Sequence, residues 1–123
     1  MFTLRLLSTI FATLFVGFGV NAILRPADAL EFFELNAPTE SAERELVNAL
    51  LAVYGVRDIF MGVAIYASAY FGNRKTLGWI VVAGSAVAFA DGAVCHLYAG
   101  KGEWNHWGYA PALTVVGGLL ALG

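Results

Sequence analysis

The sequence has little charge for its length. Charged residues make up 13% of its 123 residues, whereas 59% are hydrophobic, and soluble domains carry about a quarter charged residues. A soluble protein of this size would have too little interior for so much apolar surface, because small domains bury a smaller fraction of their area. We therefore expect a membrane protein. A soluble helical bundle with a rich core is the alternative.

Cysteine, basic tracts and metal-binding spacings are also scarce. Cys95 is the only cysteine, so the chain can form no internal disulfide, and a thiol in an apolar helix is usually inert. The net charge is −2 and no run of basic residues occurs, which argues against a nucleic-acid partner. The two histidines show neither HxxxH nor HExxH spacing. We therefore expect no metal and no cofactor.

Apolar segments lie at about 3–24, 46–71, 76–98 and 110–123. The first three suffice for the ~20 residues that a bilayer core requires. The fourth is a problem, because a helix of 13 residues rises only ~20 Å. The first segment could alternatively be a signal peptide, although its apolar run exceeds the ~7–15 residues of a signal core. The expected fold is all-α: one integral membrane domain, residues 1–123, built as a four-helix transmembrane bundle.

The connections between these segments differ in character. Arg25-Pro26 ends the first helix, since proline disfavours helix in the residue before it. ADALEFFEL (27–35) places apolar and acidic residues on different sides, which predicts a short amphipathic helix at the membrane interface. GNRK (72–75) is a tight polar turn, so the helices around it should be antiparallel neighbours. The aromatic connection at 100–109 suits the headgroup level.

Membrane orientation is not decided by the basic residues. Four crossings would place both termini on one side, and three basic residues would fall on each side of the membrane. Arg74-Lys75 is the densest basic spot and favours termini in the cytoplasm. The expected localisation is a multi-pass integral membrane protein, in the endoplasmic reticulum if the source is eukaryotic.

Three ionisable residues lie well inside the apolar segments: Arg57, Asp58 and Asp91. Each such residue costs ~2.5–3.5 kcal/mol or more at bilayer depth, and it usually faces the interior of a bundle. Sequence neighbours diverge by ~100° on a helix, so Arg57 and Asp58 should not pair well with each other. Measured from the turn, Arg57 and Asp91 both lie ~24–26 Å along antiparallel helices. This predicts an Arg57–Asp91 pair and leaves Asp58 to another donor: Asn21, Tyr54 or the loop residues Asn105 and His106.

This cluster predicts an acid/base site at membrane depth. Two carboxylates that share one arginine would titrate apart, so one could stay protonated and donate. Arg57 would orient the site and stabilise charge, while His96 or His106 would relay protons. The candidate catalytic residues are Asp91, Asp58, Arg57 and His96, and the candidate substrate-binding residues are Tyr54, Asn21, Asn48, Trp104, His106 and Glu103. The alternative is a buried ion network that only sets helix register.

The expected function is a membrane-embedded, cofactor-independent isomerase or cyclase acting on a lipophilic small molecule. The first alternative is a non-enzymatic transport or scaffold protein that forms a homo-oligomer. Gly84, Ala88 and Gly92 recur every four residues, and such a strip lets another helix backbone approach closely. The second alternative is a lipid-binding module in which the stretch 31–35 acts as a gate.

Three stretches carry a resemblance to a known family: YGVRDIFMGVAIYASAYFG, LGWIVVAGSAVAFADGAVC and GKGEWNHWGYAP. Together they resemble a family of small four-helix integral membrane proteins, common in filamentous fungi and described as a domain of unknown function. The likeness runs from Phe15 to Leu120. The resemblance implies a fold and a membrane location but no activity. Some small fungal membrane proteins act as cyclases or isomerases in natural product biosynthesis with intramembrane acids, which is an analogy of architecture only.

Overall fold

The computed structural model describes residues 2–123, which form an all-α fold. In chain order the helices are α1 (Phe2–Leu24), α2 (Pro26–Phe32), α3 (Ser41–Phe71), α4 (Arg74–Ala99), α5 (Trp104–Trp107) and α6 (Ala110–Leu122). Helices α1, α3 and α4 are each long and apolar enough to cross a membrane. Many of their large apolar side chains face outward, which suits contact with lipid and indicates a membrane protein.

Local chemistry explains where several helices begin and end. Pro26 stands in the first turn of α2, where a backbone N–H is not needed. Asn73 caps α4, because its side-chain oxygen accepts a hydrogen bond from the backbone N–H of Thr76 at 2.9 Å. Gly100 follows α4 with φ 73°, a left-handed conformation that suits glycine.

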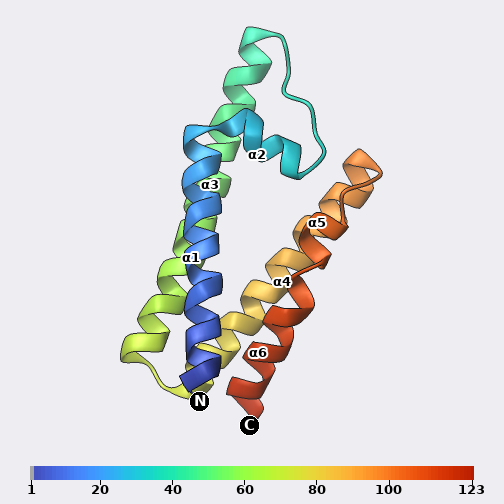
Figure 1. Cartoon of the computed structure of the whole chain (residues 1–123). Helices are drawn as coiled ribbons and strands as arrows, with labels where there is room; N and C mark the ends of the chain where they lie inside the picture. Colours follow the sequence, from blue (N-terminus) through green and yellow to red (C-terminus); the bar gives the residue numbers. More distant parts are fainter. Residues whose placement is uncertain (1) are drawn as a thin grey trace.

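The long helices form two antiparallel pairs, α1 with α3 and α4 with α6 (Figure 1). The pairs meet at the end where α1 begins and α6 ends, and they diverge toward the other end. Between them lies a core cluster that includes Phe15, Ile65, Val81 and Leu113. At the divergent end α2 crosses from the α1/α3 pair toward α5 (Figure 1). Helices α1, α2, α3 and α5 each contribute polar residues to a cavity beneath α2.

Glycines set the spacing inside each pair. A Cβ atom at Gly19 would collide with the carbonyl oxygen of Gly55, and a Cβ at Gly55 would collide with that of Gly19, so α1 and α3 approach backbone to backbone. A Cβ atom at Gly78 or at Gly117 would likewise collide with backbone atoms of the other helix, so α4 and α6 also approach backbone to backbone. Small residues at such positions are typical of helix pairs whose association depends on close packing.

The small-residue strip predicted on the third apolar segment packs against side chains rather than against another helix backbone. Gly84, Ala88 and Gly92 are all buried within the chain. Gly84 faces the ring of Phe15, and the indole of Trp107 lies where a Cβ of Gly92 would be. The strip receives side chains of the same molecule, so the expectation that another helix backbone docks there was wrong. The sequence pattern could not tell these cases apart, because both require small residues.

Other boundaries shift modestly from the expected ones. The short helix after the first segment spans Pro26–Phe32 rather than 27–35. The connection 100–109 is not all loop, because it contains the single helical turn α5, Trp104–Trp107. The last helix, α6, has 13 residues, a rise of about 20 Å, and packs along α4.

Candidate functional site

An ion cluster joins α3 to α4. The guanidinium of Arg57 donates to both carboxylate oxygens of Asp91, from Nη1 to Oδ1 at 3.1 Å and from Nη2 to Oδ2 at 2.9 Å. This two-point pairing is the strong geometry for arginine and carboxylate. The pairing of Arg57 with Asp91 that the equal depth predicted is therefore confirmed, and it fixes the register of α3 against α4.

Asp58 is also held by Arg57, contrary to expectation. Nε and Nη2 of Arg57 donate to Oδ1 of Asp58 at 3.2 and 3.0 Å. The divergence of ~100° between neighbours describes their Cα–Cβ directions, but the long arginine side chain curls back and presents five N–H donors in a fork. One cation thus serves two carboxylates. Asn21, one of the donors considered for Asp58, instead donates to Oδ2 of Asp28 at 3.1 Å.

Burial differs across the ion cluster. The side chain of Asp58 is 3% exposed and that of Asp91 12%, whereas the side chain of Arg57 is 37% exposed. Two anions and one cation leave the cluster with a formal charge of −1 when all are ionised. Arg57 contacts only Oδ1 of Asp58, so Oδ2 is the one carboxylate oxygen in the cluster that the guanidinium leaves free.

A chain of aromatic contacts runs from the ion cluster to α2 and α5. The guanidinium carbon of Arg57 lies 4.5 Å from the centre of the Tyr54 ring, within cation–π range. Phe33 meets Tyr54 edge to face with ring centres 5.4 Å apart. His106 then packs between Phe33 and Phe32, with ring centres at 4.6 and 4.7 Å. The turn α5 is thereby attached to α2, above the ion cluster.

His106 is fully buried, and neither ring nitrogen has a hydrogen-bond partner among residues 2–123. Burial lowers the pKa of His106, although the nearby carboxylate of Asp91 opposes the shift. The imidazole is therefore neutral at physiological pH. A neutral ring with no hydrogen bond between two phenylalanines acts mainly as an aromatic packing group.

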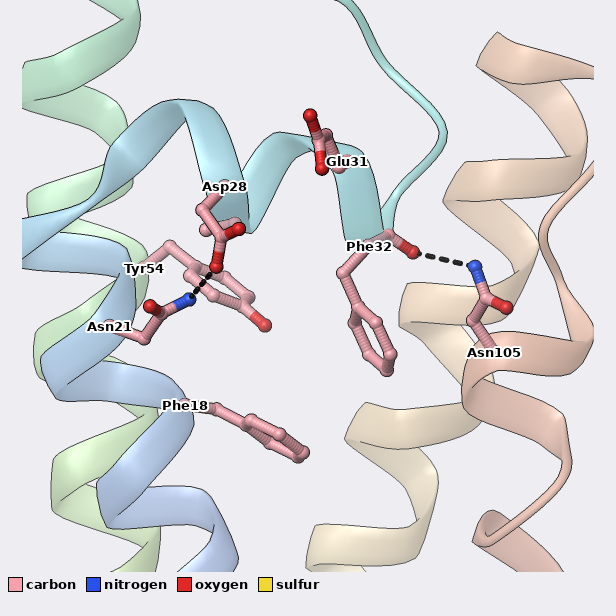
Figure 2. Close-up of a pocket in the computed structure, with 8 residues that line it drawn as sticks. Phe18, Asn21, Asp28, Glu31, Phe32, Tyr54 and Asn105 are labelled. Carbon is pink, nitrogen blue, oxygen red and sulfur yellow. Dashed lines mark hydrogen bonds between the residues drawn. The ribbon is translucent and has the colours of Figure 1, made fainter.

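A cavity of about 380 Å³ lies beneath α2, a volume within the usual range for ligand pockets. Figure 2 shows Phe18, Phe32 and Tyr54 extending into this space from α1, α2 and α3. Its remaining lining residues are Asn21, Asp28, Ala29, Glu31 and Asn105. Asn105 also closes the far side, since its Nδ2 donates to the carbonyl oxygen of Phe32 at 2.9 Å. Tyr54 belongs to both sites: it lines the cavity and supports Arg57.

Of the candidate residues, Arg57, Asp58, Asp91 and Tyr54 come together, and His106 lies close by. Asn21 lines the cavity. The others lie apart from the ion cluster. His96 is exposed, and its Nδ1 lies 3.8 Å from Oε2 of Glu103.

Trp104 and Asn48 also lie away from the ion cluster. Trp104 is exposed and meets Trp107 edge to face. Asn48 lines a separate surface hollow with Arg25 and Arg44.

Sequence reasoning missed several contributors, among them the cavity residues Phe18 and Asp28. Phe33 was expected on the apolar side of an interfacial helix and Phe32 was assigned no role, but both rings pack against His106, and Phe32 lines the cavity. Tyr109 is half buried beside the ion cluster, and burial together with the carboxylates of Asp91 and Asp58 raises the pKa of its phenol. The position of Tyr109, two residues before Pro111, could have indicated this role. The last helix begins at Ala110 and packs along α4, the helix that carries Asp91.

The chemistry available is proton transfer and electrostatic stabilisation. Asp58 has one carboxylate oxygen that Arg57 leaves free, and Tyr54 and Tyr109 supply phenols near the same charges. Among residues 2–123 no group of three or more His, Cys, Asp or Glu side chains is placed to hold a metal ion. The expectation that one aspartate stays protonated is left without support from the hydrogen bonds, since both aspartates accept from Arg57.

Comparison with known proteins places the chain within a family. Residues 12–120 match the model of a family described as a domain of unknown function, DUF4267. The match covers most of the chain, including every residue of the ion cluster and of the cavity. No curated protein and no solved structure matches the chain.

Proposed function

The chain belongs to the DUF4267 family, whose description assigns no activity, and from the site itself we propose that it is a membrane-embedded enzyme acting without a cofactor on a lipophilic small molecule. The reaction is an isomerisation or cyclisation driven by proton transfer. The observation that supports it is the ion cluster of Arg57, Asp58 and Asp91 beside a cavity with both aromatic and polar walls, with Tyr54 shared between them.

The cost of burying these charges supports a functional role. A pair or triad of buried ions is often no more stabilising than apolar residues of the same volume, so stability alone is a weak reason to keep them. Intramembrane ionisable residues usually mark a substrate or proton pathway. Gly19 of α1 lies level with Gly55 of α3. Counted in residues from that level, Arg57 and Asp58 lie about 10 Å from the C-terminal end of α1, measured along the helix axis.

In this proposal each residue has a distinct role. Oδ2 of Asp58 accepts or returns the proton, because Arg57 engages only the other oxygen of that carboxylate. Arg57, anchored by Asp91, orients Asp58 and stabilises negative charge on the substrate. The phenol of Tyr54 lies between the ion cluster and the cavity and carries the proton across. Phe18 and Phe32 supply the apolar walls that hold the substrate.

The membrane arrangement proposed with this function is multi-pass. Helices α1, α3 and α4 cross the bilayer, and α6 enters it as a fourth, shorter helix packed against α4. Its rise of about 20 Å falls short of the ~30 Å core, so it spans only where the bilayer is locally thin. Helix α2 lies at the membrane interface, where its acidic residues Asp28 and Glu31 line the cavity and Glu31 stands at the outer rim, toward the headgroups. The endoplasmic reticulum is the membrane proposed for a eukaryotic source.

The test compares lipophilic products in cells that express the wild-type chain or Asp58→Asn. We expect one or more lipid-soluble products with the wild-type chain and a loss of at least a hundredfold with Asp58→Asn, in line with the 10²–10⁴-fold contribution of general acid–base groups. The matched control is Glu45→Gln, which removes an exposed carboxylate of α3 outside both the ion cluster and the cavity. Product should persist in this control.

Folding must be measured alongside turnover. Asp58→Asn keeps the size of the side chain and can still accept from Arg57, so we expect a monodisperse protein in mild detergent. Full product formation by a folded Asp58→Asn protein would refute the catalytic role of Asp58. Loss of product together with loss of folding would instead place Asp58 among structural residues.

Ligand binding without turnover is the second candidate. It is favoured by one observation: both aspartates already accept from Arg57, so the ion cluster is largely satisfied within the chain. In that case purified protein would retain a lipophilic molecule unchanged, and Asp58→Asn would leave its amount unaltered. A homo-oligomeric transport or scaffold role would need a surface other than Gly84, Ala88 and Gly92, because these residues are buried within one chain.

A further inference from the structure

The polar part of the cavity beneath α2 is rich in acceptors and carries negative charge. Asp28 and Glu31 are the charged members of its lining, and no Lys, Arg or His among residues 2–123 joins them. Glu31 stands at the outer rim, while the carboxylate of Asp28 points down toward Asn21 (Figure 2). A ligand that carries negative charge would meet repulsion here.

Both amides of the cavity donate hydrogen bonds within the chain. Nδ2 of Asn21 donates to Asp28. Nδ2 of Asn105 donates to the carbonyl oxygen of Phe32 and to Oε1 of Glu34, at 2.9 and 3.4 Å. Each amide therefore keeps its carbonyl oxygen available, and a carbonyl oxygen can only accept. The donors left for a ligand are the Tyr54 hydroxyl and the second N–H of Asn21, whereas the acceptors include two carboxylates and two amide oxygens.

Asp28 is not neutralised by a tight ion pair. Arg25 lies 3.9 Å from its Oδ1, and the two side chains are 70% and 44% exposed. Exposed pairs at this distance contribute little, so the carboxylate keeps most of its attraction for another cation. Arg25 does not line the cavity.

Aromatic rings form the apolar wall opposite these acceptors. Phe18 and Phe32 lie with ring centres 5.6 Å apart, and Tyr54 faces them across the space (Figure 2). Aromatic faces attract an ammonium group and also bind hydrocarbon. Carboxylate, carbonyl oxygens and aromatic rings around one cavity are together complementary to an organic cation.

We propose that the ligand of this cavity is a lipophilic amine, whose ammonium group lies between Asp28 and the rings of Phe18 and Tyr54. The proposal rests on the proposed function for the existence of a lipophilic ligand, and it adds the charge of that ligand. The ammonium donates to Asp28 and to the free carbonyl oxygen of Asn21. The hydrocarbon part follows Phe18 and Phe32 toward the outward apolar surface of α1.

Binding of three probes with the same chain tests the charge preference: dodecylamine, dodecanol and dodecanoate, added to the protein in neutral maltoside micelles at pH 7 and measured by native mass spectrometry. We expect dodecylamine to bind at least about tenfold more tightly than either of the others, which corresponds to about 1.4 kcal/mol. Equal binding of all three overturns the inference and leaves lipophile binding intact. Binding of none overturns both this inference and the proposed function.

Variants assign the preference to residues. Asp28→Asn should bring dodecylamine binding down to the level of dodecanol, and Phe18→Leu should weaken the amine several-fold while sparing the alcohol. Glu45→Gln removes a carboxylate on an exposed part of α3 outside the cavity and should change nothing. An unchanged amine preference in both cavity variants would refute the assignment.

Asp58→Asn separates this inference from the catalytic role, because Asp58 does not line the cavity. This variant should bind dodecylamine like the wild type even where product is lost. Competition with phosphatidylcholine distinguishes the source of the ammonium group. Displacement of dodecylamine would support a membrane lipid headgroup as the natural cation, and absence of displacement would support a free amine.

Discussion

Replacing Arg57 with glutamine tests whether the ion cluster holds α3 and α4 together. The change removes four N–H···O hydrogen bonds, two to Asp58 and two to Asp91. It leaves two carboxylates facing each other without a cation, one of them 3% exposed. Removing one partner of a buried ion pair costs about 3–5 kcal/mol. The side chain of Arg57 is 37% exposed. We therefore expect Arg57→Gln to lower the free energy of unfolding by the lower end of this range, about 3 kcal/mol.

The assay is unfolding by sodium dodecyl sulfate in mixed micelles, followed by circular dichroism. Arg25→Gln is the matched control, since Arg25 forms an exposed pair with Asp28 and exposed pairs contribute about 0–1 kcal/mol.

A double-mutant cycle then tests the contact itself. Arg57→Gln with Asp91→Asn should cost less than the sum of the single changes, because the second change removes one unpaired carboxylate. The reasoning fails if Arg57→Gln costs no more than Arg25→Gln, or if the two single costs add within about 0.5 kcal/mol.

Three further predictions concern packing and pH. Gly19→Ala should destabilise the α1/α3 pair because its Cβ would collide with a carbonyl oxygen of α3, whereas Gly17→Ala, which faces open space, should be neutral or slightly stabilising in the same unfolding assay. Burial lowers the pKa of His106 below its usual value of about 6.5. His106 therefore binds a proton more readily in the unfolded chain than in the native chain. The free energy of unfolding should fall as the pH drops below about 6.5, and His106→Gln should reduce this pH dependence. Trp107→Phe removes a hydrogen bond of 3.0 Å to a backbone carbonyl of α4 and should cost about 1 kcal/mol, whereas the same change at the exposed Trp104 should have little effect on the melting temperature.

Much of the candidate site could be predicted because depth along a helix is a matter of counting. Arg57 and Asp91 lie at equal distances from the turn at 72–75, and antiparallel helices joined there bring equal distances together. The failure at Asp58 has a different cause. Helical angles describe where a side chain leaves the backbone, and the arginine side chain is long enough to return over its own helix to the next residue.

The cavity was less predictable than the ion cluster. Its wall combines Phe18 from α1, Phe32 from α2, Tyr54 from α3 and Asn105 from α5, and no spacing in the chain relates these positions. Their meeting depends on the angle at which the two helix pairs diverge and on the path of α2 between them (Figure 1).

By itself, the sequence determined the apolar lengths of the helices, their interruption at Arg25-Pro26 and at 72–75, and the depth of the buried charges. These are properties of single segments, governed by transfer of side chains to an apolar phase and by backbone geometry. The tertiary structure alone decided which small residues meet backbone and which meet an indole, and it alone gathered acceptors and rings under α2. Those outcomes depend on which faces pack together, and in helices that are apolar all round the pattern of residues does not select one face.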